Sequence, residues 1–196
     1  MAQPAAPPQR SSLVRCIGLI LVALVILVGL IVIITWLAVQ PKKLRYSIEE
    51  GSISGYNLTK SNHLNATFHL VLRATNPSHQ MSLYYDRITV TASFEDQKLS
   101  ILNVSPFYQG RTNVTHLDLQ LAAEGVALYG AVAGDLRMEQ AAGYVDIDVE
   151  FRAKIRLKFG VFKVHRKLRV LCGSVTVPLG KKPMGFERVW CDVDRY

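Results

Sequence analysis

The sequence predicts a mainly β protein with a single N-terminal transmembrane helix followed by an antiparallel β-sandwich that carries one further helix. Two observations lead to this prediction. An uncharged, apolar segment at residues 16–39 precedes the rest of the chain, and the remainder contains repeated runs in which apolar and polar side chains alternate. A chain of 196 residues holds about one domain beside such a segment. This length excludes a large multidomain enzyme.

Residues 16–39 are long enough to cross a membrane. As a helix they would rise about 36 Å, against a hydrocarbon core of about 30 Å. Trp36 suits a membrane interface, and Pro41 ends the helix. The alternative, a cleaved signal peptide, needs a shorter apolar region and a small-x-small cleavage site, which residues 36–40 do not offer. We therefore predict an uncleaved signal anchor that contacts the lipid bilayer through residues 16–39.

The orientation follows from glycosylation sequons, because the basic residues on the two sides of the span nearly balance. Four of the six asparagines begin Asn-x-Ser/Thr, which is far above chance. These candidate glycosylation sites are Asn57, Asn65, Asn103 and Asn113, with Asn103 the weakest because Pro106 follows its Ser105. Residues 41–196 are thus predicted to be luminal or extracellular, which makes the protein single-pass type II.

The short side of the span is predicted to be a cytoplasmic tail, residues 1–15, too short to fold. Cys16, at the cytoplasmic edge of the span, is a candidate for S-acylation, and a free thiol facing lipid is the simpler alternative. The span contains no Gly-x-x-x-Gly motif, so a homo-oligomer is left open without a motif to support it.

The clearest strand is predicted at residues 144–159, where every second residue is apolar and those between 145 and 159 are all charged. Because this segment is longer than most strands, a bend or bulge is expected near Arg152. Gly160 turns the chain into a return strand from Phe162 to Cys172. Weaker alternation predicts further strands in residues 67–76, 88–95 and 116–121, and helical spacing predicts a helix at residues 122–142.

No pattern in the sequence indicates catalysis. The five histidines are scattered without metal-ligand spacing, and no nucleophile elbow, P-loop or dinucleotide-binding motif is present. The carboxylates Asp146, Asp148 and Glu150 share one strand face, but the bases that follow on the same face favour a charge-paired surface over a calcium or catalytic site. We predict no enzyme activity, metal or cofactor.

Residues 151–186 carry ten Lys or Arg and no acid, and therefore the whole net charge of +8. Eight of them form a predicted anionic-ligand face: Arg152, Lys154, Arg156, Lys158, Lys163, Arg166, Lys167 and Arg169. Nucleic acid would be one ligand of such a surface, but an extracellular domain does not meet it. The remaining candidates are anionic cell-surface polysaccharide, other anionic ligands and a negatively charged partner, with a merely solubilising face as the alternative.

Cys172 and Cys191 are the only cysteines beyond the span. In an oxidising compartment they predict one disulfide that ties the C-terminal tail to the last hairpin. A buried thiol at Cys172, which falls on the apolar side of its strand, is the alternative.

Several motifs in a fixed order resemble one plant family. They are Asn76-Pro77, Ser82-Leu83-Tyr84-Tyr85-Asp86, Pro106-Phe107-Tyr108-Gln109-Gly110, Cys172-Gly173-Ser174-Val175-Thr176-Val177 and Cys191-Asp192-Val193-Asp194. The chain resembles the harpin-induced-like, non-race-specific-disease-resistance-like proteins, which carry a late-embryogenesis-abundant group 2 domain. This chain has Ser78 where the family often has a second Asn, and Ser makes a similar turn.

The resemblance implies a fibronectin-III-like sandwich with one helix and no catalytic residues. It also implies a plasma-membrane glycoprotein, sometimes at plasmodesmata, that acts in pathogen defence and the hypersensitive response. Its partner would be a wall component or a membrane immune partner. Two alternative functions stay open, namely abiotic-stress (desiccation) protection and a lipid-binding module. The predicted organisation is a tail at 1–15, an anchor at 16–39, a juxtamembrane linker and first strand at 40–62, and the sandwich at 63–196.

Overall fold

The computed structural model describes residues 10–38, 43–179 and 186–195. The chain divides into two compact units, Met1–Pro41 and Lys42–Tyr196. In the first unit, helix α1 runs over Arg10–Ala38 and contains Val14–Ile34, a stretch long and apolar enough to cross a membrane, with none of it buried in protein. The predicted span lies within α1 except for Val39, which falls outside the described residues, as do residues 1–9 of the predicted tail.

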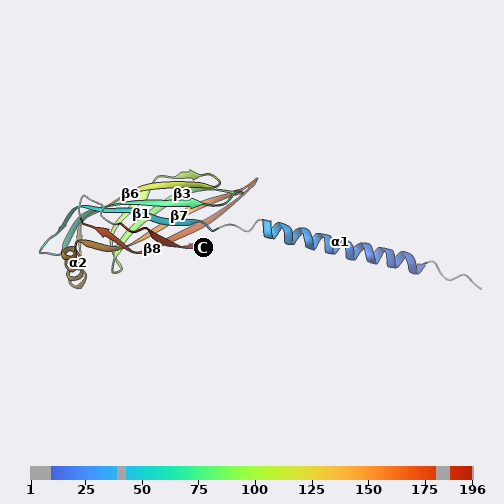
Figure 1. The fold of residues 1–196 in the computed structure, drawn as a ribbon, viewed down its shortest axis with the longest axis horizontal. Coiled ribbons are helices and arrows are strands. Elements are labelled where there is room, and N and C mark those ends of the chain that lie inside the picture. The colour runs from blue at the N-terminus through green and yellow to red at the C-terminus, as the bar shows by residue number, and fades with distance from the viewer. Residues whose placement is uncertain (1–9, 39–42, 180–185, 196) are drawn as a thin grey trace, which may run out of the picture. The chain divides into compact units, whose positions relative to one another are not determined.

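The second unit is a mainly β domain, as the alternating pattern predicted (Figure 1). Its strands are β1 (Arg45–Leu58), β2 (His63–Asn76), β3 (Met81–Phe94), β4 (Gln97–Val104), β5 (Phe107–Gln109), β6 (Asn113–Ala127), β7 (Tyr144–Phe159), β8 (Phe162–Pro178) and β9 (Val189–Arg195). Helix α2 covers Gly130–Ala142 and lies at one end of the domain (Figure 1). The pairs of strands are antiparallel, which confirms the predicted fold class.

The strands follow the order β4-β3-β7-β8-β9-β1-β2-β6, with β5 beside β3. β9 connects the two halves of this sheet, because it pairs with β1 at Tyr46–Ile48 and with β8 at Leu168–Leu171. At the other ends of the order, Ser100 of β4 donates a hydrogen bond to the carbonyl of Ala122 in β6, at 2.7 Å. The sheet therefore folds over on itself and closes around one core.

The core follows from the alternation of each strand. Along β2, every second residue from Leu64 to Ala74 is buried, while the residues between them are partly exposed. The largest fully buried side chains include Tyr46, Phe68, Tyr85 and Phe151, which fill the space between the two halves of the sheet. The interior of the domain is thus packed with side chains.

Residues 40–62 were predicted as a juxtamembrane linker with the first strand. Within them, β1 pairs with β2 along most of its length and with β9 near its start. Tyr46 and Ile48 of β1 are fully buried in the core. This strand is therefore an integral part of the sandwich.

The predicted helix at residues 122–142 was wrong in its first part. Ala122 and Ala123 continue β6, paired with Thr67 and Ala66 of β2, and the helix begins only at Gly130. Alternation places Leu121 and Ala123 in the core, and this burial against β2 outweighs the helical preference of alanine.

The bulge expected near Arg152 lies in the neighbouring strand, because the register between β3 and β7 shifts at Asp86, opposite Lys154 and Ile155. Arg152 pairs in register with Thr89 on one side and Arg169 on the other. A second shift, between β7 and β8, lies at Ile147 and Val149, where β8 contributes extra residues, and the backbone of Ser174 there has φ +51. Asp148 accepts a hydrogen bond from the Ser174 amide at 3.0 Å, which satisfies the irregular backbone.

Candidate functional site

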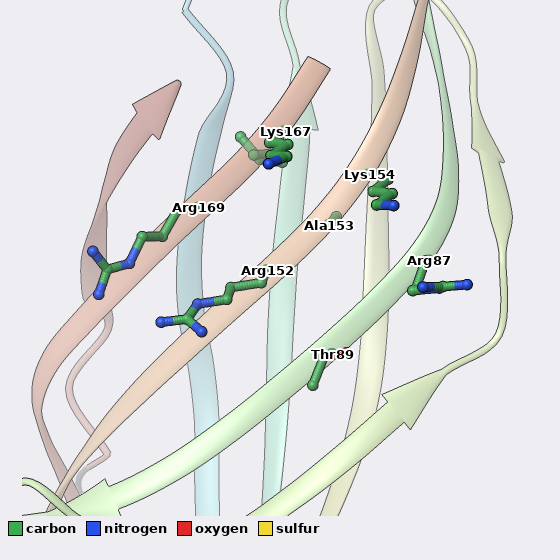
Figure 2. A pocket seen from close by; sticks show the side chains of 8 residues that line it. Arg87, Thr89, Arg152, Ala153, Lys154, Lys167 and Arg169 are labelled. Carbon is green, nitrogen blue, oxygen red and sulfur yellow. The ribbon is translucent and has the colours of Figure 1, made fainter. Parts of the chain in front are cut away.

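The outer face of β3, β7 and β8 carries a concentration of cationic side chains in rows. Residues paired across strands point to the same face of a sheet, about 4.8 Å apart. One row is Arg87, Lys154 and Lys167, and the next is Thr89, Arg152 and Arg169. A hollow of about 500 Å³ lies over these two rows (Figure 2). We call its five cationic residues, Arg87, Arg152, Lys154, Lys167 and Arg169, the basic groove.

The two rows of the groove differ in how their charges are neutralised. Glu150 forms ion pairs with Arg152, at 2.8 Å, and with Arg169. Arg152 and Arg169 project to the same side from neighbouring strands (Figure 2). The single Glu150 carboxylate thus forms ion pairs with two guanidinium groups.

The row Arg87, Lys154 and Lys167 has no such partner. Among residues 43–179 and 186–195, none of these three cations has a carboxylate oxygen within 4.0 Å. All three residues are exposed. Like charges placed directly opposite each other across strands are destabilising, so this row lowers the stability of the fold. The same positive charges attract anions from solution.

Arg156, a third outward residue of β7, is neutralised locally. It forms an ion pair with Asp86 at 2.6 Å, and its guanidinium lies 4.5 Å from the centre of the Tyr84 ring. Asp86 reaches this position because the register of β3 shifts between Tyr85 and Arg87. Arg156 therefore adds little to the attraction of anions by the groove.

Seven of the eight predicted face residues share this outer face. They are Arg152, Lys154, Arg156, Lys158, Lys163, Lys167 and Arg169, by their register in β7 and β8. Arg166 was placed wrongly, because it pairs with Ile155 and so belongs to the opposite face of the sheet. Arg87 and Thr89 of β3 also lie on this face and were not predicted from the sequence. Their place beside β7 depends on a pairing between strands far apart in the sequence.

Three residues of the family-like motifs, Asn76, Tyr85 and Gln109, are buried and form hydrogen bonds near one another, together with Tyr46 of β1. The Tyr46 and Tyr85 hydroxyls are 2.7 Å apart, and the Tyr85 hydroxyl donates to Oε1 of Gln109 at 3.1 Å. Nδ2 of Asn76 donates to the carbonyls of Met81 and Gly110, each at 2.8 Å. Burial raises the pKa of Tyr85 to about 12, so it stays a neutral hydrogen-bonding group. These motif residues hold the strands together.

The two other tyrosines of these motifs lie at the surface. Tyr84 is 39% exposed and Tyr108 is 62% exposed, and the two residues are paired across β3 and β5. Tyr108 is therefore available for contact with a partner, whereas Tyr84 is covered in part by Arg156.

The remaining predicted sites are placed as follows. A disulfide joins Cys172 of β8 to Cys191 of β9, with the two Cα atoms 4.3 Å apart. Asn57, Asn103 and Asn113 are exposed, and Asn65 is partly exposed, with its side-chain oxygen accepting a hydrogen bond from the Gly125 amide at 2.8 Å. Cys16 is a free, exposed cysteine of α1. Glycosylation and acylation at these residues stay predictions.

Within the described ranges, no group of three or more His, Cys, Asp or Glu side chains is placed to hold a metal ion. The outward carboxylates Asp148 and Glu150 of β7 are engaged with Ser174 and with the two arginines of the groove, respectively. Both carboxylates therefore have a structural role.

Comparison with known proteins identifies the family. The profile of the family described as late embryogenesis abundant protein matches residues 71–172, from β2 to the first half of β8. An uncharacterized protein of Arabidopsis thaliana, At1g08160, is 33% identical over 94% of this chain and 85% of its own length. NDR1/HIN1-like proteins 10 and 3 of the same plant are 29% and 30% identical, over 82% and 89% of this chain and 72% and 78% of their own lengths. The chain therefore belongs to the late embryogenesis abundant protein family, and the NDR1/HIN1-like proteins are its relatives.

Proposed function

We propose that this protein is a non-enzymatic, membrane-anchored glycoprotein that acts in plant defence. The family and the NDR1/HIN1-like relatives support a role in plant defence or stress. Helix α1 supports a membrane anchor, and the four sequons support an extracellular C-terminal domain. In this proposal the protein is single-pass type II in the plasma membrane, with plasmodesmata as a further location.

The basic groove is the proposed recognition site, and its ligand is an acidic polysaccharide of the cell wall. The observation that carries this proposal is the row Arg87, Lys154 and Lys167, which no carboxylate neutralises among the described residues. A solubilising surface needs no such row, since charges of both signs interspersed serve that purpose. A polymer with one carboxylate on each sugar can place several anions along the row at once.

The binding of polygalacturonate to the full chain in nanodiscs tests this proposal. The double substitution Lys154→Glu and Lys167→Glu should lower the affinity at least about tenfold, because two attractive charges become repulsive. Arg166→Glu and Lys60→Glu together form the matched control, with the same change in net charge, because Arg166 lies on the opposite face and Lys60 is an exposed residue between β1 and β2. Methyl-esterified polygalacturonate, which lacks the charges, should bind weakly. Equal binding of both variants would disprove the role of the groove.

The proposed topology has a separate test. Glycosidase treatment of the membrane-bound protein should reduce its mass, and protease added to intact protoplasts should remove the C-terminal domain. A domain that is protected and unglycosylated would place residues 43–195 in the cytosol and would contradict the type II proposal.

The family description also favours protection against abiotic stress as a second candidate function. This function predicts accumulation of the protein on drying, and a defect of the null mutant under water loss. A defect confined to infection would argue against it. A lipid-carrying function has less support, because large side chains such as Phe68 and Phe151 occupy the interior of the sandwich.

A further inference from the structure

The hairpin between β7 and β8 ends in an apolar tip. Phe159 and Phe162 are paired across the strands, and Gly160 and Val161 form the turn, with Gly160 at φ +54. Val161 is 87% exposed and Phe162 is 73% exposed. Turns are usually built from small and polar residues, so two large apolar side chains in solvent cost free energy that contact with an apolar partner would recover.

Cations lie directly behind this tip. Lys158 and Lys163 form a cross-strand pair next to Phe159 and Phe162, and both lysines are exposed. Among the described residues, neither lysine has a carboxylate oxygen within 4.0 Å. We call Lys158, Val161, Phe162 and Lys163 the hairpin tip. An apolar end backed by unneutralised lysines is complementary to a bilayer surface that contains anionic lipids, where acyl chains lie beneath the headgroups.

The strand that enters the domain begins at the same end of the sandwich as the hairpin tip. Arg45, the first residue of β1, pairs with Thr75 of β2, and Asn76 next to it is hydrogen-bonded to Met81 of β3. Met81 in turn pairs with Phe159, the last residue of β7. Helix α2 precedes β7 in the chain, so α2 belongs to the opposite end (Figure 1). Residues 39–44 separate α1 from β1 in the sequence.

We propose that the hairpin tip docks onto the extracellular leaflet of the bilayer that holds α1, with Val161 and Phe162 inserted among the lipids and Lys158 and Lys163 against anionic headgroups. This inference rests on the membrane anchor of the proposed function. The anchor makes that bilayer the favoured surface, since it is held at a high effective concentration by the covalent link. Docking also gives the domain a second attachment to the membrane, separate from the basic groove, which stays available for a ligand.

Tryptophan fluorescence of the full chain in nanodiscs tests the proposal. The native Trp36 and Trp190 are replaced by Phe, and Phe162→Trp supplies the reporter. In discs of phosphatidylcholine and phosphatidylserine with brominated acyl chains, emission of the reporter should shift to the blue and be quenched. Ile101→Trp in the same background is the matched control, since Ile101 is an exposed apolar residue of β4. Its emission should be quenched several-fold less.

Two further measurements complete the test: one changes the charge of the lysines or of the lipid, and the other varies the protein concentration. Lys158→Glu with Lys163→Glu, or discs of phosphatidylcholine alone, should weaken docking about 25-fold or more, from about fivefold for each lysine. Equal quenching at positions 162 and 101 in anionic discs would overturn the proposal. A blue shift that appears without lipid and grows with protein concentration would also overturn it, because the tip would then bind a second copy. Failure of the chain to enter discs at all would refute the anchor rather than the hairpin tip.

Discussion

The hydroxyl oxygens of Tyr46 and Tyr85 lie 2.7 Å apart inside the sandwich, although 39 residues separate them in the sequence. Because Tyr85 donates its proton to Gln109, Tyr46 is the donor to Tyr85. Nε2 of Gln109 then donates to the carbonyl of Ala74 in β2, at 2.8 Å. This chain of hydrogen bonds connects β1, β3, β5 and β2 across the core, where Phe107 also stacks on Tyr85 with ring centres 4.2 Å apart.

Tyr85→Phe should destabilise the domain by about 1–3 kcal/mol, because Gln109 and Tyr46 each lose a hydrogen-bond partner in the buried core. Chemical denaturation followed by circular dichroism measures the change in the free energy of unfolding. Tyr108→Phe is the control, since Tyr108 is 62% exposed, and its effect should stay within about 0.5 kcal/mol. Equal effects of the two substitutions would disprove the structural role of the buried network.

Stability should fall in acid through Glu49, which forms ion pairs with Arg73 and Arg188 at 2.9 Å and with His116 at 3.2 Å. The hydrogen bond from Arg73, more than any other interaction, holds the pKa of Glu49 below its ordinary value of 4.5. A carboxyl with a lowered pKa stabilises the fold above its unfolded pKa, and this stabilisation is lost as the pH falls through the folded pKa.

The free energy of unfolding of Glu49→Gln should therefore be lower than that of the wild type at neutral pH, by about 1 kcal/mol or less because the pairs are partly exposed. The free energies of unfolding of the two proteins should become equal once the pH is below the folded pKa of Glu49. Glu50→Gln, at the exposed neighbouring position, serves as the control in the same titration. A difference in the free energy of unfolding that stays constant down to acid pH would show that the charge of Glu49 does not cause the stabilisation.

Glu150→Gln should strengthen the binding of polygalacturonate by about fivefold, because it removes the carboxylate that neutralises Arg152 and Arg169 in the basic groove. The salt dependence of binding should also become steeper. Calorimetric titration at two ionic strengths measures both quantities. Glu124→Gln, an exposed acid of β6, changes the net charge equally and should leave the affinity nearly unchanged. Weaker binding by Glu150→Gln would mean that Glu150 positions the arginines for the ligand.

Loss of the disulfide between Cys172 and Cys191 should destabilise the domain by about 3 kcal/mol, since it closes a loop with a sequence separation of 19 residues. Thermal unfolding of the double variant Cys172→Ser and Cys191→Ser measures the loss, and reductant should lower the wild-type midpoint in the same way. The midpoint of the double variant should not respond to reductant. An unchanged midpoint in the variant would show that β9 is held by its strand pairing alone.

The sequence by itself determined the elements whose signal is local. An uncharged run fixed the existence of α1, and strict alternation fixed β7 and the face that each of its residues presents, because both depend only on neighbours along the chain. The same alternation placed most of the cationic residues of β7 and β8 on one face of the sheet. Arg166 was wrongly assigned to the predicted face, because its charge was counted without regard to the side of β8 on which it lies.

Only the tertiary structure decided which strands lie beside one another. The pairing of β3 with β7 brings Arg87 into the basic groove, and the pairing of β6 with β2 keeps Ala122 and Ala123 in a strand although their composition favours a helix. The hairpin tip and the first residue of β1 likewise share one end of the domain only through contacts of β2 and β3. These features depend on hydrogen bonds and burial between residues far apart in the chain, which a local pattern does not encode.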